Sequence, residues 1–137
     1  MEQIINKLKS AYLNKNNLLF VIKTKKGRRF GAFSHELFLE EHFQKLDSKA
    51  FLFSLDNMKI LQSTNKSHTI WNGDLNSIQF GTGTDLRIFY DFSSNQNYTS
   101  EARGYIQDYN YGFMQTYILN GEKYFSVDIF EIFQIYI

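Results

Sequence analysis

The chain has no cysteine and no proline among its 137 residues. Without cysteine there is no disulfide framework, no thiolate metal site and no cysteine nucleophile. Without proline there is no proline-rich linker that would separate two domains. The formal net charge of +1 also argues against a dedicated nucleic-acid-binding protein, because such proteins carry a strong basic excess.

Long apolar runs are absent as well. No stretch reaches the ~18 residues that a membrane-spanning helix needs. The first residues, Met1–Ile5, lack the basic-then-apolar order of a signal peptide. We therefore expect a cytoplasmic protein with no membrane span. One local concentration of charge, Lys23–Arg29, is interpreted as a solvated hairpin tip, with a patch for an acidic partner, a lipid headgroup or a phosphate as the alternative.

The sequence is rich in aromatic residues. Hydrophobic residues make up 43% and aromatic residues 18%, with 14 phenylalanines and 9 tyrosines. This composition is far too apolar for a disordered chain. A chain of this length fits one domain and is long enough to bury a substantial core.

The first half of the chain alternates between short apolar runs and turn residues. Residues 2–13 have the spacing of a short amphipathic helix. Leu18–Lys23 and Arg29–Phe33, separated by a turn at Lys25–Gly27, give the best hairpin pattern in the chain. Residues 34–43 are predicted to form a helical turn or short helix with Ser34 as its N-cap.

The rest of the chain is predicted to be mostly strands. Short apolar runs that fit strands occur at residues 49–55, 58–62, 69–71, 78–80 and 86–90. The polar residues 93–100 read as a surface loop. Phe125–Ile137 is the longest candidate and is apolar on both faces, which predicts a central strand. The pattern favours a mainly β fold, a β-sandwich of two antiparallel sheets with a few peripheral short helices, over a barrel.

A glycine pair lies between two of the predicted strands. Gly81 and Gly83 follow Phe80, and Asp85 precedes Leu86. A dinucleotide loop needs a third glycine and a following helix, and a phosphate-binding P-loop needs Gly-Lys-Ser/Thr. Neither is present, so we interpret the loop as a bend between strands. Asp85 is then a loop cap that bonds to backbone N–H groups, with a polar anchor in a ligand cleft as the alternative.

Few other side chains suggest chemistry. The histidines are His35, His42 and His68, and the first two lie seven residues apart, so they could share a helix face. No third ligand is apparent beside them, and a structural zinc site usually has four. Glu131 is unusual because it lies within an apolar strand, where an unpaired charge would be costly to bury. We expect either that the strand bends so that Glu131 reaches water, or that an arginine or backbone N–H groups pair with it in a structural tether. The candidate arginines are Arg87 and Arg103.

Four motifs in order resemble the TLDc family. They are Phe30-Gly31-Ala32-Phe33, then Ala50-Phe51-Leu52-Phe53-Ser54-Leu55, then Phe80-Gly81-Thr82-Gly83-Thr84-Asp85-Leu86, and the closing strand Phe125–Ile135. The resemblance covers about residues 17–137, which predicts a single TLDc-like β-sandwich domain there, preceded by a helix and loop at residues 1–16. TLDc domains usually carry a further segment at the N-terminus, so this domain is expected to be shortened or to be completed by another chain.

The resemblance implies a two-sheet sandwich and no established enzymatic chemistry. Members of the family are linked to protection against oxidative stress, and several bind the vacuolar proton-pumping ATPase (V-ATPase) and regulate its assembly. Small solitary members occur in protists. By this resemblance the chain is expected to bind protein partners, such as V-ATPase subunits or a larger assembly.

Three hypotheses for function follow. The first is a non-catalytic intracellular protein-binding domain without cofactor, metal or nucleic-acid partner. Its structural or binding candidates are Phe30, Gly31, Phe80, Gly81, Gly83, Asp85 and Glu131. The second is a structural accessory subunit of a large complex that docks through an exposed sheet edge. The third, an enzyme or small-ligand binder, needs Asp85, Glu131 and a histidine to converge in one cleft.

Overall fold

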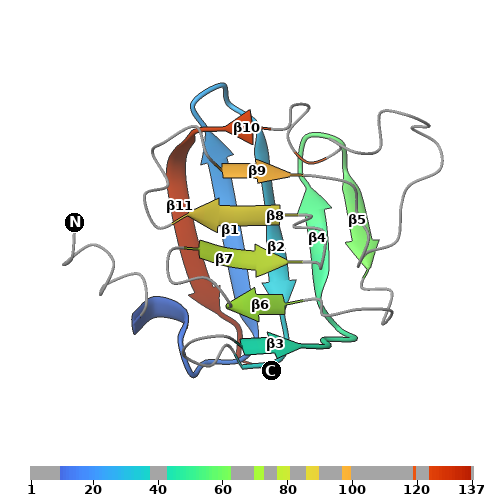
Figure 1. The fold of residues 1–137 in the computed structure, drawn as a ribbon. Helices are drawn as coiled ribbons and strands as arrows, with labels where there is room; N and C mark the ends of the chain where they lie inside the picture. Colours follow the sequence, from blue (N-terminus) through green and yellow to red (C-terminus); the bar gives the residue numbers. More distant parts are fainter. Residues whose placement is uncertain are drawn as a thin grey trace.

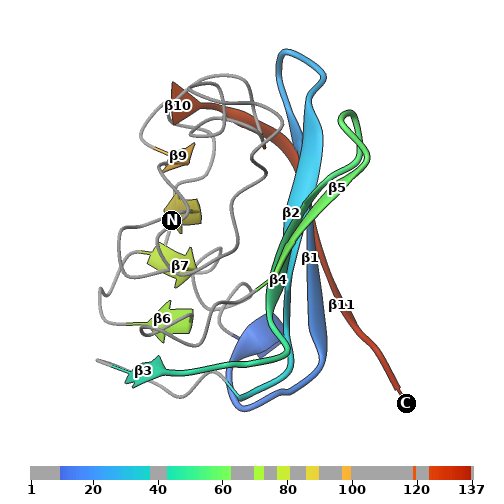
Figure 2. The same ribbon diagram turned by 90° about the vertical axis from the view of Figure 1, so that its right-hand side faces the viewer.

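The chain folds into two antiparallel β-sheets packed face to face (Figures 1 and 2). The computed structural model describes residues 10–37, 43–62, 70–72, 77–80, 86–89, 97–99, 119 and 124–136. One sheet has five strands in the order β11-β1-β2-β4-β5, and the other has six in the order β10-β9-β8-β7-β6-β3. The predicted mainly β sandwich is confirmed.

The five-stranded sheet is built from the two ends of the described sequence. Its strands in chain order are β1 (Leu18–Thr24), β2 (Arg29–Ser34), β4 (Phe51–Ser54), β5 (Lys59–Gln62) and β11 (Val127–Gln134). All four neighbouring pairs are antiparallel. The C-terminal strand β11 is therefore paired with β1, the first strand of the chain.

The six-stranded sheet comes mostly from the middle of the chain. Its strands are β3 (Phe43–Lys45), β6 (Ile70–Asn72), β7 (Ser77–Phe80), β8 (Leu86–Phe89), β9 (Asn97–Thr99) and β10 (Tyr124–Phe125). They run across the direction of the five-stranded sheet (Figure 1). Residues 97–99 were predicted to belong to a polar loop, and this is wrong, because they pair with β8 and β10.

The core lies between the two sheets (Figure 2). The five-stranded sheet buries alternate residues of β1, and Phe20 is one of them, with its ring edge-on to Phe80 of the other sheet at 5.4 Å between centroids. Phe30 meets Phe125 in the same geometry at 5.1 Å. Edge-to-face ring pairs of this kind add about 0.5–1.5 kcal/mol to the area that they bury.

The β1–β2 hairpin forms as predicted. The connection between the strands, residues 25–28, places Gly27 at a φ of 88°, a left-handed conformation that glycine adopts without strain. The N–H of Gly27 donates to the carbonyl of Thr24 over 2.9 Å, and the N–H of Arg28 donates to the Thr24 hydroxyl over 3.1 Å. The loop fixes the register of the pair, so that Leu18 to Lys23 face Ser34 to Arg29.

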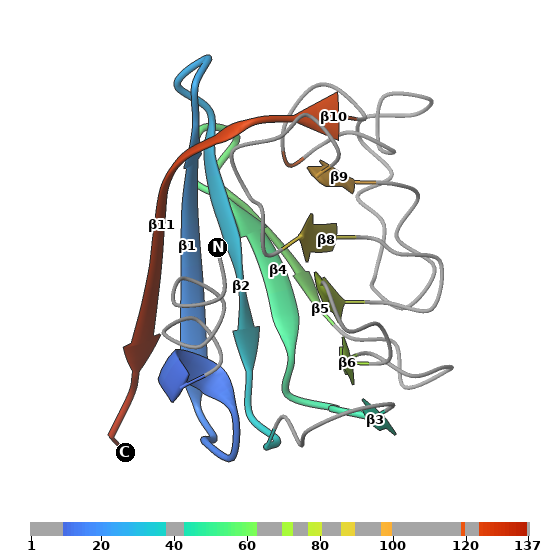
Figure 3. The same cartoon turned by 60° about the vertical axis from the view of Figure 1, so that its left-hand side comes forward.

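The C-terminal segment differs most from its prediction. It passes from one sheet to the other at Ser126, and Figure 3 shows it crossing between β10 and β11. A β-bulge follows, since Thr24 pairs with Val127 whereas Lys23 pairs with Ile129. The bulge reverses the alternation of side chains. Val127 therefore points into the core with Phe130 and Ile132, whereas unbroken alternation along the strand would place Val127 on the same side as Ile129 and Glu131.

Strand β11 lies at the edge of its sheet, so the predicted central position is also wrong. The apolar side chains on both sides of the strand predicted burial on both faces. In the structure one side packs on the core and the other forms part of an exposed apolar surface. A sequence pattern alone does not distinguish these two environments, because both are built from the same residue types.

Two helix predictions have different outcomes. Residues 10–12 are helical and Tyr12 is fully buried, in agreement with the amphipathic helix predicted over residues 2–13, whose first part lies outside the described residues. The helix predicted at residues 34–43 is wrong at both ends. Ser34 is the last residue of β2, not an N-cap, residues 35–37 are not helical, and Phe43 begins β3.

Candidate functional site: an exposed apolar face

The side of the five-stranded sheet that faces away from the core is mostly apolar. Two rows of side chains cross it in register. The first row is Phe133, Leu19, Phe33, Phe51 and Gln62, and the second is Glu131, Val21, Gly31, Phe53 and Ile60. We call these ten residues, together with Ile129, Leu55 and Met58 at their margin, the outer face. Ile60 is 59% exposed and Phe133 is 45% exposed.

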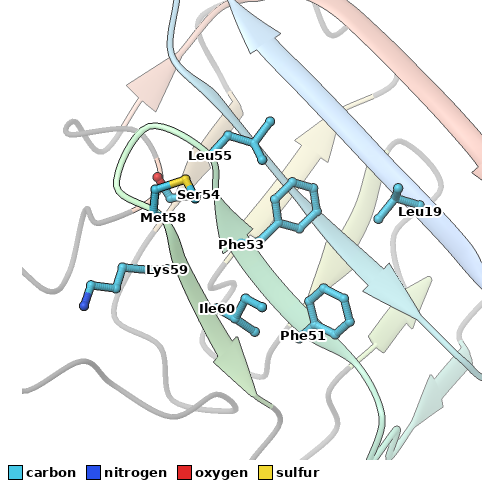
Figure 4. Close-up of a pocket in the computed structure, with 8 residues that line it drawn as sticks. All are labelled: Leu19, Phe51, Phe53, Ser54, Leu55, Met58, Lys59 and Ile60. Atoms are coloured by element: carbon cyan, nitrogen blue, oxygen red, sulfur yellow. The ribbon is translucent and has the colours of Figure 1, made fainter.

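A pocket of ≈ 360 Å³ opens on the outer face at the β4–β5 side (Figure 4). Its apolar lining comes from Leu19, Phe51, Phe53, Leu55, Met58 and Ile60. Ser54 and Lys59 complete the wall. The volume is at the lower end of the range of about 300–1,000 Å³ that is typical of ligand pockets. The arrangement favours an apolar group of a partner and offers little polar chemistry.

Gly31 shapes the floor of the outer face. A Cβ atom at this position would lie 2.6 Å from Cζ of Phe53 and would also overlap the backbone carbonyl oxygen of Phe20. The Phe53 ring therefore occupies the space that a side chain at position 31 would need. This is the known pairing of an aromatic residue with a strand glycine across an antiparallel pair. Gly31 is required for space, since its φ is not in the left-handed region.

The rings next to Gly31 support one another. Phe33 and Phe51 are stacked with centroids 5.2 Å apart and planes 17° apart. The Phe53 ring follows at 6.3 Å from that of Phe51. Contacts of this type hold partly exposed rings in fixed positions, so the pocket has a firm floor before any partner arrives.

Met58 stands at the rim with an unusual backbone. Its φ is 53°, a region that is uncommon for residues other than glycine, asparagine and aspartate. Its side chain is 83% exposed. A residue other than glycine in this left-handed region costs about 1–3 kcal/mol. Methionine is an adaptable contact residue at binding surfaces, and Met58 holds its side chain in solvent at the edge of the pocket.

The end of the outer face next to the β1–β2 hairpin is basic. Lys23 lies in line with Leu19 and Val21 on β1, and it is exposed, as are Lys25 and Arg28 in the turn. Arg29 is neutralised by Asp56, because its Nη2 lies 3.0 Å from Oδ1 and its Nε donates to the same oxygen over 3.0 Å.

Asp56 fastens the β4–β5 turn to the hairpin. The backbone N–H of Arg29 donates to Oδ2 over 2.7 Å. This hydrogen bond does most to lower the pKa of the Asp56 carboxyl below its ordinary value of 3.8. Partial desolvation opposes it, and the charges of Arg29 and Arg28 add to it. The ionised carboxylate therefore stabilises the junction between the pocket and the basic end.

A second polar cluster, which the sequence interpretation missed, lies at the opposite end of the sheet. The buried carboxylate of Asp47 accepts hydrogen bonds from the N–H groups of His35 (2.7 Å), Glu36 (2.9 Å) and Lys49 (3.2 Å). Nδ1 of His35 lies 2.7 Å from Oδ1 of Asn17. The cluster ties the end of β2 to the segment before β4, and Asn17 gives the His35 ring a polar partner.

The candidates chosen from the sequence are found in different places. Phe30 and Phe80 are core residues, and Gly31 lies under Phe53 on the outer face. Glu131 is exposed on the outer face opposite Val21. A tether from Glu131 to Arg87 is wrong, because Arg87 belongs to β8 in the other sheet.

The remaining candidates lie outside the described residues. They are Gly81, Gly83, Asp85, Arg103, His42 and His68. The convergence of Asp85, Glu131 and a histidine therefore stays a prediction. Among the residues that the structure describes, no group of three or more histidine, cysteine or acidic side chains could hold a metal ion. No helix within the same part of the chain is long and apolar enough to cross a membrane.

The family model for the TLDc domain matches residues 2–136. The chain belongs to the TLDc family. The resemblance that the four motifs indicated is confirmed, and the match also takes in residues 2–16. No curated protein matches the chain.

The structure gives a physical reason for two of the TLDc motifs. The Phe-Gly-Ala-Phe motif is in β2 and the Phe-Leu-Phe-Ser motif forms β4, and Gly31 pairs directly with Phe53. A ring in one motif thus requires a glycine in the other. The two phenylalanines at alternate positions of β4 were a usable signal for the outer face. Nothing in the sequence marks Met58, whose backbone conformation is visible only in the structure.

Proposed function

We propose that this TLDc domain is a non-catalytic protein-binding module that docks on its partner through the outer face. The observation that carries the proposal is the pocket and its surroundings, where the partly exposed Phe51 and Phe53 and the exposed Ile60 form an apolar surface. Contiguous exposed apolar patches on folded proteins mark interaction sites. Membership of the TLDc family adds a V-ATPase subunit, or a component of an oxidative-stress response, as the partner that we propose first.

Affinity purification with a matched pair of variants tests this function. Ile60→Lys places a charge in the outer face, whereas Leu46→Lys places one on a residue of similar exposure (48%) in the connection after β3. We expect the wild type and Leu46→Lys to recover the same partner, and Ile60→Lys to lose it. A partner that is retained equally by all three proteins would contradict docking through this face.

A structural accessory subunit, such as a component of a protist cytoskeletal or organellar assembly, is the second candidate. One observation favours it. The edge of β11 that points away from β1 pairs with no other strand among the described residues, and the strand is 8 residues long. An edge of this length is a template for strand addition. A partner that survives Ile60→Lys but is lost in Ile129→Lys, which charges the edge strand at the margin of the outer face away from the pocket, would support this second function.

A further inference from the structure

The outer face combines an apolar pocket with a basic end, and this combination narrows the chemistry of the partner. We propose that the element that docks there is an amphipathic α-helix with acidic residues near one end, lying along the direction of β1. The inference rests on the proposed protein-binding function, and it adds the shape and the charge of the bound segment.

The pattern of charge gives the orientation. The pocket is lined by apolar side chains of β4, β5 and the turn between them, together with Leu19 of β1. Lys23 lies on β1 two outer-face positions beyond Leu19 towards the hairpin, with Val21 between them. Lys25 and Arg28 follow in the turn. Of the acidic side chains at this end, Asp56 pairs with Arg29, and the exposed Asp128 lies in the β11 bulge beside Lys23 and Thr24. Lys23, Lys25 and Arg28 leave the end with a net positive charge. A bound segment whose apolar side chains enter the pocket would therefore have cations next to the end that lies towards the hairpin. Acidic residues at that end of the segment would complement these cations.

The length of the face suits a helix. Lys25 is six residues beyond Leu19 in the chain, which is about 20 Å at the rise of a strand. A helix rises 1.5 Å per residue, so about 13 residues, or three to four turns, cover the same distance. One apolar stripe at a spacing of three to four residues would then reach the pocket, while the last turn reaches the lysines.

A helix also fits this surface better than an extended segment. The outer face presents side chains, not a strand edge, so it offers few partners for the N–H and C=O groups of a segment lying on it. A helix satisfies these groups internally, whereas an extended chain over Phe51 and Phe53 would have its backbone groups desolvated and unpaired. The helix-in-groove mode follows from this difference.

A membrane surface is the less favourable occupant. Glu131 is exposed on the same face, in line with the row of Phe53 and Ile60. An anionic bilayer that covered the whole face would press this carboxylate against lipid phosphates. A helix over the pocket side leaves Glu131 in water.

The proposal is tested with the whole chain and three synthetic peptides, measured by fluorescence anisotropy. The first is a helix-forming peptide of about 16 residues with a leucine stripe and glutamates in its last turn. The second has lysines in place of the glutamates, and the third has the composition of the first in an order without a stripe. We expect the acidic peptide to bind about tenfold more tightly than the lysine peptide at low salt, with the difference falling as salt is added.

Charge exchange sharpens the test. In the double variant Lys23→Glu and Lys25→Glu the preference should invert in favour of the lysine peptide. In the matched variant Lys15→Glu and Lys49→Glu, which reverses two charges away from the hairpin, the preference should stay as in the wild type. Ile60→Lys should weaken both striped peptides. Equal binding of all three peptides, or an unchanged preference in the hairpin variant, would overturn the proposal.

Two further measurements distinguish the proposed helix from two other occupants of the outer face, a membrane and a second copy of the chain. Binding to vesicles of phosphatidylcholine and phosphatidylserine that is lost in Ile60→Lys, without any peptide preference, would assign the face to a membrane. Dimerisation that is lost in Ile60→Lys would assign it to a second copy of the chain. If the peptides show no preference while Ile60→Lys still loses its partner from lysate, the helix is wrong and the protein-binding function stands.

Discussion

The two faces of the five-stranded sheet are made of similar residues but differ in what covers them. Phe20 and Phe30 on the inner face are fully buried against the second sheet. Phe51, Phe53 and Phe133 on the outer face keep contact with solvent. Hydrophobicity alone therefore identifies a surface that is suited to burial. Whether the fold or a partner covers this surface depends on where a complementary surface lies.

The largest effect should come from the inner face. Phe20→Ala removes a ring that packs on Phe80 and is stacked on Phe130 at 6.2 Å. We expect a loss of about 3–5 kcal/mol in the free energy of unfolding, which is typical of a buried phenylalanine. Urea denaturation checks the value. Phe133→Ala is the outer-face counterpart and should cost less than about 1 kcal/mol, and equal losses in the two variants would remove the distinction between the faces.

The stability of the variant Gly31→Ala tests whether part of the outer face is tightly packed. In Gly31→Ala the new methyl group meets the Phe53 ring and the Phe20 carbonyl oxygen. The ring can move but the strand backbone cannot move without disturbing the sheet, so we expect a loss of about 1–3 kcal/mol. The double variant with Phe53→Ala relieves only the contact with the ring. Thermal unfolding of both variants measures how much of the cost comes from the backbone, and no loss in Gly31→Ala would contradict the close packing.

Asp56 provides a smaller, pH-dependent effect at the boundary of the outer face. Because the pKa of its carboxyl is lowered in the folded state, its contribution is fully present above the unfolded value and is lost as the pH falls through the folded value. The ion pair is exposed, so we expect less than about 1 kcal/mol. The stability difference between wild type and Asp56→Asn should be constant above about pH 5 and shrink below about pH 4. A difference that grows on acidification would have the wrong sign.

The smallest effect on stability should come from the centre of the proposed docking surface. Ile60→Lys changes a residue that is 59% exposed, and we expect the free energy of unfolding to stay within about 0.5 kcal/mol of the wild type. The long aliphatic stem of lysine lies along the apolar surface while its charge stays in water. Guanidinium unfolding measures this value, and a loss above about 2 kcal/mol would show that Ile60 belongs to the core.

Local signals in the sequence predicted much of the first half of the fold. The apolar run of β1, the glycine at position 27 and the following Arg29–Phe33 run gave the hairpin almost to the residue. Short-range turn chemistry is visible in the sequence because the residues that make it are neighbours. The same holds for the Asp56–Asn57 turn between β4 and β5.

Features that depend on distant residues were not predicted. The bulge beside Val127 arises because one strand leaves the second sheet and joins β1, which is about 100 residues away in the chain. The edge position of β11 is likewise a matter of topology. Asp47 carries no signal of its own, because its hydrogen-bond donors at His35 and Glu36 are brought to it only by the fold. For the site, the alternating Phe51 and Phe53 were visible, but their exposure was not.

Footprinting of Met58 tests the docking claim most directly. The chain would be labelled at side chains with a carbene reagent, once alone and once in the complex recovered from lysate, and the peptide that contains Met58 quantified by mass spectrometry. Because Met58 is 83% exposed at the rim of the pocket, we predict strong labelling in the free chain and strong protection in the complex, with Leu46 labelled equally in both. Labelling of Met58 that is the same in both states would contradict docking on the outer face.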